Sequence, residues 1–289
     1  MNGTALALIV TGALLHATWN LLAKKAAGGA PFVWLYGVVS LAAASPLVVV
    51  EFVNGSAAFG VSAWLAIAVS AAAHLVYSLT LQQGYRASDF SVVYPVARGT
   101  GPLFAVLGAI VLLGERPTLL GGLGIVLILL GIAFVADVLA GVRAHAAKAR
   151  AGILWGAVTG VSIAAYTVVD GWAVRTLAIA PIAYYAFGLL LRTLFLAPAA
   201  LGRTSALREQ WRTNGRLIVA VGILSPTAYL LVLYAMQSAP VSYVAPTREL
   251  SMLLGVLFGA RVLRERLSVP RITGTMLLLA GVTCLAVAK

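Results

Sequence analysis

Ten apolar segments of about 20 residues each fill almost the whole chain, and short polar joints separate them. Each segment is long enough to cross a hydrocarbon core of roughly 30 Å as a helix. The predicted spans are residues 3–23, 31–51, 62–82, 91–113, 118–138, 151–172, 181–201, 216–237, 242–262 and 270–288. The pattern therefore predicts an all-α membrane protein with ten transmembrane helices.

The last five segments repeat the pattern of the first five. The clearest correspondences are Val10-Thr11-Gly12 with Val158-Thr159-Gly160, Arg98 with Arg248, and Glu115 with Glu265. Because five is odd, a five-helix unit ends on the side of the membrane opposite to its start, so its copy inserts upside down. We predict two inverted five-helix repeats, residues 1–139 and 151–289, with a basic linker at 140–150. Inverted repeats with charged residues at membrane depth are typical of secondary transporters.

Small residues recur at the same places in the fifth helix of each repeat. Gly124 and Gly131 match Gly274 and Gly281. Small residues seven apart let helix backbones approach closely in lipid. We expect these two helices to supply close-packed contacts, and a contact between the two is left open.

The composition agrees with a membrane protein. Of 289 residues, 62% are hydrophobic and 10% are charged, against roughly 25% charged in soluble proteins. The single cysteine, Cys284, excludes an intrachain disulfide and makes a thiolate metal cluster implausible. Residues 1–12 hold no Lys or Arg, which is the wrong polarity for a cleaved signal peptide, so the first segment is expected to stay as a helix.

The basic residues lie in the joints, where they meet lipid headgroups, so the net charge of +12 does not indicate nucleic-acid binding. The joints of one side hold Lys24, Lys25, Arg86, Arg143, Lys148, Arg150, Arg203, Arg208, Arg212, Arg216, Arg264, Arg266 and Arg271, and those of the other hold Arg116, Arg175 and Lys289. Short basic loops face the cytoplasm. This predicts both termini outside, in a bacterial inner (plasma) membrane.

A proline opens the fourth helix of each half, and an acidic-basic pair follows it. These motifs are Tyr94-Pro95 with Gly114-Glu115-Arg116, and Ala245-Pro246 with Arg264-Glu265-Arg266. With the glycine-containing fifth helices, they make the chain resemble the drug/metabolite transporter (DMT) superfamily, specifically its ten-helix members with two EamA repeats. The resemblance implies export or exchange of amino acids, nucleobase-like metabolites, sugars or drugs. It also implies cytoplasmic termini, in conflict with the charge count.

Arg192 is expected about 16 Å from the start of its predicted span, close to the bilayer midplane. A lone arginine there costs about 2.5–3.5 kcal/mol on insertion scales, which favours a function, with packing against backbone carbonyls as the alternative. Arg98 and Arg248 lie roughly 10 Å deep, where snorkelling is the alternative. The prolines before them favour partly unwound helix starts. Glu249 is expected to pair with Arg98 or Arg192 on another helix, either as a structural ion pair or as a proton-coupling site.

Further polar side chains fall on shared helix faces. His16, Trp19 and Asn20 share one face of the first helix, and His74 and Tyr77 share one face of the third. Histidine titrates near neutral pH, so His16 and His74 are candidates for proton coupling, with a buried, hydrogen-bonded histidine as the alternative for each.

Four more residues complete the candidate set. Tyr94 shares a face with Arg98, and Tyr229 is a candidate cavity hydroxyl. Tyr166 and Asp170 lie four apart on the sixth helix. Asp170 is a further candidate for coupling, although it is close to the end of its span, where solvation is the simpler interpretation.

Together these features predict a secondary transporter that moves a small metabolite by alternating access, by efflux or exchange. Three deep arginines against one deep acid favour a carboxylate- or phosphonate-bearing solute, with an amino acid or related zwitterion first. The cavity is expected between the halves, lined by the first, third, fourth, sixth, eighth and ninth helices. Lipids and the substrate are the expected partners, a homodimer is left open, and no metal or organic cofactor is implied.

Two other functions compete with transport, and a channel is a third, weaker alternative. An intramembrane enzyme acting on a lipid head group would use His16 or His74 as a base, but the sequence has no G-x-S-x-G, P-loop or H-E-x-x-H motif. In a structural membrane protein the polar groups would only tie helices together. A channel is disfavoured because no ring of like charges is visible.

Overall fold

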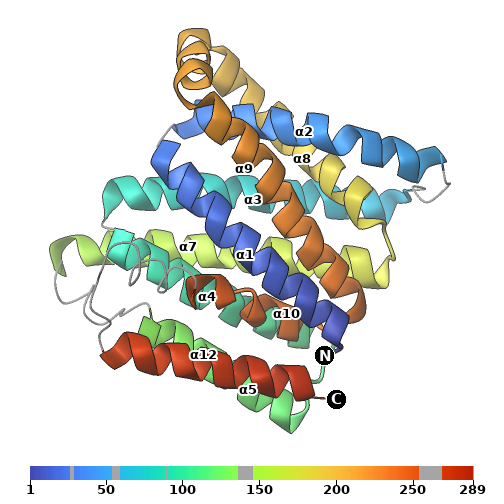
Figure 1. Cartoon of the computed structure of the whole chain (residues 1–289), viewed down its shortest axis with the longest axis vertical. Coiled ribbons are helices and arrows are strands. Elements are labelled where there is room, and N and C mark those ends of the chain that lie inside the picture. The colour runs from blue at the N-terminus through green and yellow to red at the C-terminus, as the bar shows by residue number, and fades with distance from the viewer. Residues whose placement is uncertain (27–28, 54–58, 89, 136–145, 254–268, 289) are drawn as a thin grey trace.

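The computed structural model describes residues 1–26, 29–53, 59–88, 90–135, 146–253 and 269–288 (Figure 1). Its helices are α1 (Gly3–Ala26), α2 (Gly29–Val53), α3 (Val61–Ala87), α4 (Phe90–Leu112), α5 (Leu119–Val135), α7 (Ala146–Gly171), α8 (Pro181–Leu201), α9 (Thr204–Ser238), α10 (Val241–Thr247) and α12 (Val269–Val287), with a π-helical turn η1 (Trp172–Thr176). Eight of these are long and apolar enough to cross a membrane. The predicted all-α membrane fold is confirmed.

Several helix boundaries differ from the prediction, and those of α9 and α7 show the reason. α9 begins at Thr204 rather than at residue 216, with a kink at Asn214, whose φ of −120° is not helical. α7 begins at Ala146, inside the predicted linker, and η1 extends it past the predicted end. Hydropathy identifies only the part of a helix that lies in lipid, so polar helical extensions escape it. Residues 254–262 of the predicted ninth span lie outside the described residues.

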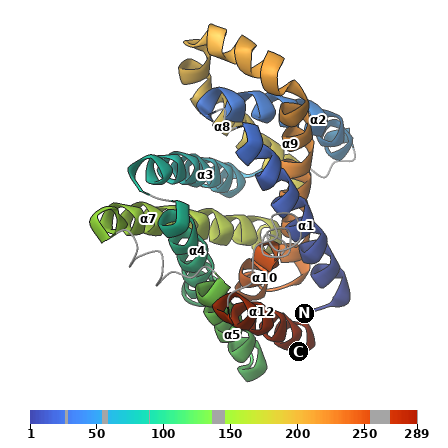
Figure 2. The ribbon, with the colours of Figure 1, turned by 60° about the vertical axis from the view of Figure 1, so that its left-hand side comes forward.

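Each helix of the first repeat packs mainly against helices of the second. α1 packs on α9, α2 packs on α8 and α9, and α3 and α4 pack on α7. Figures 1 and 2 show α2 and α8 at one end of the long axis and α5 with α12 at the other. The interface between the repeats is therefore the interior of the protein.

Glycines join α5 and α12, as their spacing predicts. A Cβ atom on Gly124 would lie 2.8 Å from the carbonyl oxygen of Gly281, and one on Gly131 would lie 2.8 Å from that of Gly274. The residue numbers of the contacts increase along α5 and decrease along α12, so the two helices run antiparallel. The predicted small-residue contact is thus made between the fifth helices of the two repeats.

Both chain termini lie at the same end of the helices. The Met1 ammonium donates to the carbonyl oxygen of Ala288 at 2.7 Å. We call this end the terminal end, and the opposite end, where α1 ends and α2 begins, the basic end. Among described bases, Lys25, Arg86, Arg150 and Arg203 belong to joints of the basic end.

Candidate functional site

Arg98 joins three helical segments inside the protein. Its Nη1 lies 3.1 Å from Oε1 of Glu249, and its Nη2 lies 2.6 Å from Nε2 of His16. The side chains of Arg98 and Glu249 are 12% and 5% exposed. A guanidinium can only donate, so His16 accepts through Nε2 and is neutral, with its proton on Nδ1. Glu249 therefore has one of its two predicted partners.

The helix carrying Glu249 is interrupted at the site. α10 ends at Thr247, Arg248 and Glu249 form a turn, and helical structure resumes at Leu250. Pro246 has no N–H to give to the helix, and the Glu249 N–H bonds to the Pro246 carbonyl with the shorter spacing of a turn, at 3.0 Å. The helix start Val241–Thr247 is itself regular through Pro246, so the predicted unwinding is limited to the turn at Arg248 and Glu249.

The matching expectation for the first repeat is wrong. α4 runs without a break from Phe90 to Leu112, through Arg98. Its neighbour α7 presents glycines there: a Cβ on Gly156 would lie 2.8 Å from Cβ of Val96, and one on Gly160 would overlap Thr100. Close packing along the helix holds α4 regular in spite of its proline.

A small pocket lies beside Arg98, between the repeats. It is lined by Gly12, Ala13, His16, Arg98, Ala228, Tyr229, Val232 and Arg248. Its volume of about 20 Å³ leaves room for a water molecule but not for a metabolite. The Arg248 guanidinium lies 5.2 Å from the centre of the Tyr229 ring, within the range of a cation–π contact. The pocket thus gathers four of the predicted residues.

Tyr229 connects the pocket to a buried aromatic group. The His74 ring stacks on Tyr166 with ring centres 3.8 Å apart, and Tyr229 contacts both rings edge-on. His74 Nδ1 lies 3.0 Å from the Ser70 carbonyl oxygen, so that nitrogen is already hydrogen-bonded. Tyr77 packs edge-on to Tyr166, 6.0 Å away. His74, Tyr77 and Tyr166 lie behind the pocket, and only Tyr229 belongs to its lining.

Asp170 is buried and not solvated, contrary to the simpler interpretation of its position. It is 1% exposed, and its carboxylate accepts hydrogen bonds from Tyr184, at 2.6 Å, and from Tyr229. The end of α7 continues into η1, and α8 packs its first turn beside it, so the span's end is covered by protein. Asp170 is thereby linked through Tyr229 to the pocket.

The remaining predicted residues lie at the margin of the site. Arg192 is half-buried, donates from Nε to the Gly188 carbonyl oxygen at 3.3 Å, and lies 5.2 Å from the Tyr185 ring. Asn20 donates to the His16 carbonyl oxygen at 2.8 Å.

Two aromatic residues of the predicted set contact His16 or Arg98. Trp19 meets His16 edge-on, and Tyr94 lies 5.4 Å from the Arg98 guanidinium. The buried indole nitrogen of Trp19 has no hydrogen-bond partner among the described residues. A buried donor without a partner is unfavourable, so the face of α1 that carries His16 retains unused polar capacity.

Sequence reasoning missed Ser70, Tyr184 and Tyr185. The i, i+4 spacing of Ser70 and His74 was a usable signal, whereas nothing in the sequence connects Tyr184 to Asp170 on another helix.

Charges in the site are unevenly compensated. In the part of the chain that the structure describes, no carboxylate oxygen lies within 4.0 Å of the guanidinium of Arg192 or Arg248. Glu249 Oε2 is buried and has no hydrogen-bond partner there either. The described residues hold no group of three His, Cys, Asp or Glu that could bind a metal ion. Among the described residues, the site therefore holds a pocket-lining guanidinium without a carboxylate partner, that of Arg248, and a carboxylate oxygen without a hydrogen bond, that of the neighbouring Glu249.

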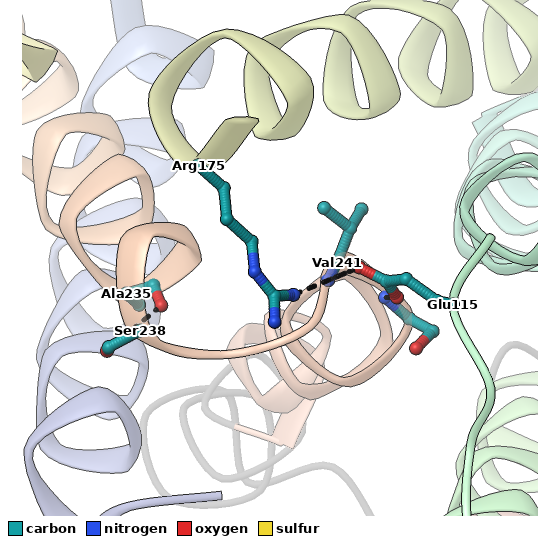
Figure 3. A network of polar contacts seen from close by, with 6 residues as sticks. Glu115, Arg175, Ala235, Ser238 and Val241 are labelled. Atoms are coloured by element: carbon teal, nitrogen blue, oxygen red, sulfur yellow. Dashed lines mark hydrogen bonds and ion pairs between the residues drawn. The ribbon is translucent and has the colours of Figure 1, made fainter. Parts of the chain in front are cut away.

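Glu115 lies outside this site, at the joint after α4. Its carboxylate accepts hydrogen bonds from Arg175 Nη1 at 3.3 Å and from the N–H groups of Val241 and Ser242 (Figure 3). The sequence does not indicate that these partners all belong to the second repeat.

Comparison with known proteins identifies the family. Residues 3–136 and 150–287 each match the EamA-like transporter family. No curated protein matches the chain significantly. A solved structure described only as "Crystal structure of protein" is 18% identical, covers 98% of this chain and 96% of its own, and has a TM-score of 0.73, a likeness of fold alone. With both halves matched, the chain belongs to the EamA-like transporter family of the DMT superfamily, and it is an integral membrane transporter rather than an enzyme.

Proposed function

We propose that this transporter moves a small carboxylate-bearing metabolite, with an amino acid as the first choice, by alternating access and in the direction of efflux or exchange. The observation that carries the proposal is the pocket between the repeats, where Arg248 has no carboxylate partner among the described residues. The basic end would face the cytoplasm of an inner (plasma) membrane, following the charge count.

The polarity of the substrate follows from the compensation of charges. Glu249 neutralises Arg98 through one oxygen, so Arg248 supplies the excess positive charge of the pocket. Guanidinium binds carboxylates through two parallel hydrogen bonds. The free oxygen of Glu249 can accept from an ammonium group on the same solute. An amino acid carries both groups, and its two charges would leave the site's net charge unchanged.

Alternating access accounts for the small size of the pocket. With room for water only, the site must open toward one end before a metabolite can bind. The turn at Arg248 and Glu249, where tighter i→i−3 bonds follow the regular helical bonds, lies beside the pocket and in this resembles the discontinuous helices of other carriers. Substrate binding and helix movement would thus involve the same residues.

Three groups are suited to proton coupling. His16 accepts from Arg98, so protonation of Nε2 would break that contact and place two cations side by side. Asp170 is linked to the pocket through Tyr229 and would lose acceptor capacity on protonation. His74 is a third candidate, because its ring contacts Tyr229. A proton on any of these groups would alter contacts at the pocket.

The test is counterflow in proteoliposomes loaded with a panel of amino acids, phosphonates and cationic drugs, with and without a pH gradient. We expect accumulation of an amino acid or another carboxylate, and its loss in Arg248→Gln. Arg116→Gln, an exposed arginine outside the site, is the control and should transport normally. A preference for cationic drugs, or unchanged carboxylate counterflow in Arg248→Gln, would contradict the proposal.

A further inference from the structure

One carboxylate at the terminal end holds three segments together. Glu115 follows α4 and receives the Val241 N–H at 2.7 Å, the Ser242 N–H at 2.9 Å and Arg175 Nη1 at 3.3 Å. Figure 3 shows Arg175 reaching from η1, which continues α7, and Val241 in the first turn of α10, both toward Glu115. Val241 and Ser242 are fully buried, so their N–H groups depend on this acceptor.

The contact crosses between the repeats. Glu115 belongs to the first repeat, and Arg175 and Val241 belong to the second. α10 leads directly into the turn with Arg248 and Glu249, so Glu115 also sets the position of the segment that carries the substrate site. In alternating access, contacts between repeats at one end must break when that end opens.

Apolar packing closes the same end. A buried cluster there joins the first turns of α1, α3 and α8 to the last turns of α9 and to η1, with Ile9, Ile67, Val174, Leu233 and Met236 among its members. These residues come from both repeats and leave the terminal end filled. The three bonds of Glu115 continue this closed layer across α4 and α10.

The basic end is different. A pocket of about 410 Å³ lies there between the start of α2, the end of α3 and the end of α8, with Ser78, Thr80, Gln83, Arg86 and Arg203 among its polar lining. Ser78 is one helical turn from His74. Among the described residues, the terminal end thus holds the larger apolar cluster, whereas the basic end combines this pocket with a smaller cluster around Phe32 and Ile218.

We propose that Glu115 is a positioning residue for transport, which closes the terminal end in the state that is open toward the basic end. The Arg175 ion pair is the breakable part of the contact, because Arg175 is 41% exposed and the backbone bonds are buried. When the ion pair separates, α7 moves away from the α4–α5 joint and the terminal end opens. This inference rests on the alternating access of the proposed function but on no particular substrate.

The experiment measures access to the pocket from each end. Cys284 is the only cysteine, so Cys284→Ala removes it and Ala228→Cys places one reporter in the lining of the central pocket. A membrane-impermeant thiol reagent is applied to the full-length protein in sealed vesicles of each orientation, and a C-terminal tag reports the sidedness. Arg175→Gln, Arg175→Lys and Glu115→Gln are compared with the control Arg116→Gln.

We expect faster labelling from the basic end in the parent protein. Arg175→Gln should raise labelling from the terminal end by about two- to fivefold and lower it from the basic end, with Arg175→Lys close to the parent. Glu115→Gln should have a larger effect, about tenfold, because one of the two buried N–H groups loses its acceptor oxygen and faces an amide donor instead. Equal rates from both ends in all variants, or parallel changes at both ends, would overturn the inference.

Arg175→Gln keeps the test decisive if Glu115→Gln fails to fold, because its side chain is partly exposed. Labelling needs no substrate, so its outcome is separate from that of counterflow. A protein that shows the opposite changes at the two ends but moves no amino acid would support the role of Glu115 and reject the proposed substrate.

Discussion

Arg98 and Glu249 form an ion pair at 3.1 Å across a sequence separation of 151 residues. Arg98 and Arg248 occupy equivalent positions of the two repeats, yet only Arg98 is paired with this carboxylate. The cause is visible in the sequence, where Gly99 stands at the position that corresponds to Glu249. The two repeats therefore hold an arginine at equivalent positions, and only the arginine of the first repeat has a carboxylate partner among the described residues.

Breaking the Arg98–Glu249 pair from one side should destabilise the protein more than removing both partners. Arg98→Met and Glu249→Gln each leave an uncompensated buried group, at a cost of about 3–5 kcal/mol. The double variant should recover much of the thermal stability in detergent without recovering transport. Double-variant stability equal to the sum of the two losses would show that the contact contributes no coupling.

Arg248→Lys separates charge from geometry. Lysine keeps the positive charge but cannot form two parallel bonds to a carboxylate, so the KM for a carboxylate substrate should rise about tenfold, with a smaller change in kcat. Uptake kinetics in proteoliposomes measure this split. An unchanged KM would mean that Arg248 acts only through its charge and forms no pair of hydrogen bonds with the substrate carboxylate.

Asp170→Asn tests coupling. Asparagine can still accept a hydrogen bond from Tyr184 or Tyr229 but cannot carry a proton, so a pH gradient should no longer drive uptake while substrate exchange continues. Tyr184→Phe removes one bond to Asp170 and keeps the carboxylate, which makes it the matched control. Gradient-driven uptake that persists in Asp170→Asn would exclude this residue from coupling.

The α5–α12 contact predicts opposite results for two neighbouring glycines. Gly124→Ala would place a Cβ 2.8 Å from the Gly281 carbonyl oxygen, so thermal unfolding should show a loss of about 1–3 kcal/mol. At Gly122 nothing lies within 4 Å of the added Cβ, and Gly122→Ala should gain about 0.5–1 kcal/mol from helix propensity. Similar stabilities for both variants would argue against the close approach of these helices.

Both termini should lie outside the cytoplasm if the basic end faces inward. An epitope tag at either end should then be reached by an impermeant protease in intact spheroplasts. Replacing Arg86 and Arg203 by Gln should weaken this preference, because positive joints hold their side in the cytoplasm. If the tag on the parent protein were protected from the protease, the termini would lie in the cytoplasm and the basic end would face outward.

The sequence alone determined the membrane class, the inverted duplication and most helix positions, because a bilayer demands apolar runs of nearly constant length. It also determined that Glu249 needs a partner on another helix, since a carboxylate cannot stay alone at that depth. Gly124 and Gly131 could be assigned to a packing face because close approach requires small residues wherever it occurs.

Only the tertiary structure decided which polar groups meet. The covered end of α7 turned Asp170 from a surface residue into a buried acceptor, and packing on α7 kept α4 helical through Arg98 while α10 broke at the equivalent place. The partners of Glu115 were likewise decided by the fold. Helix periodicity gives the direction of a side chain on its own helix, but the neighbour it meets depends on how helices from two distant halves pack together.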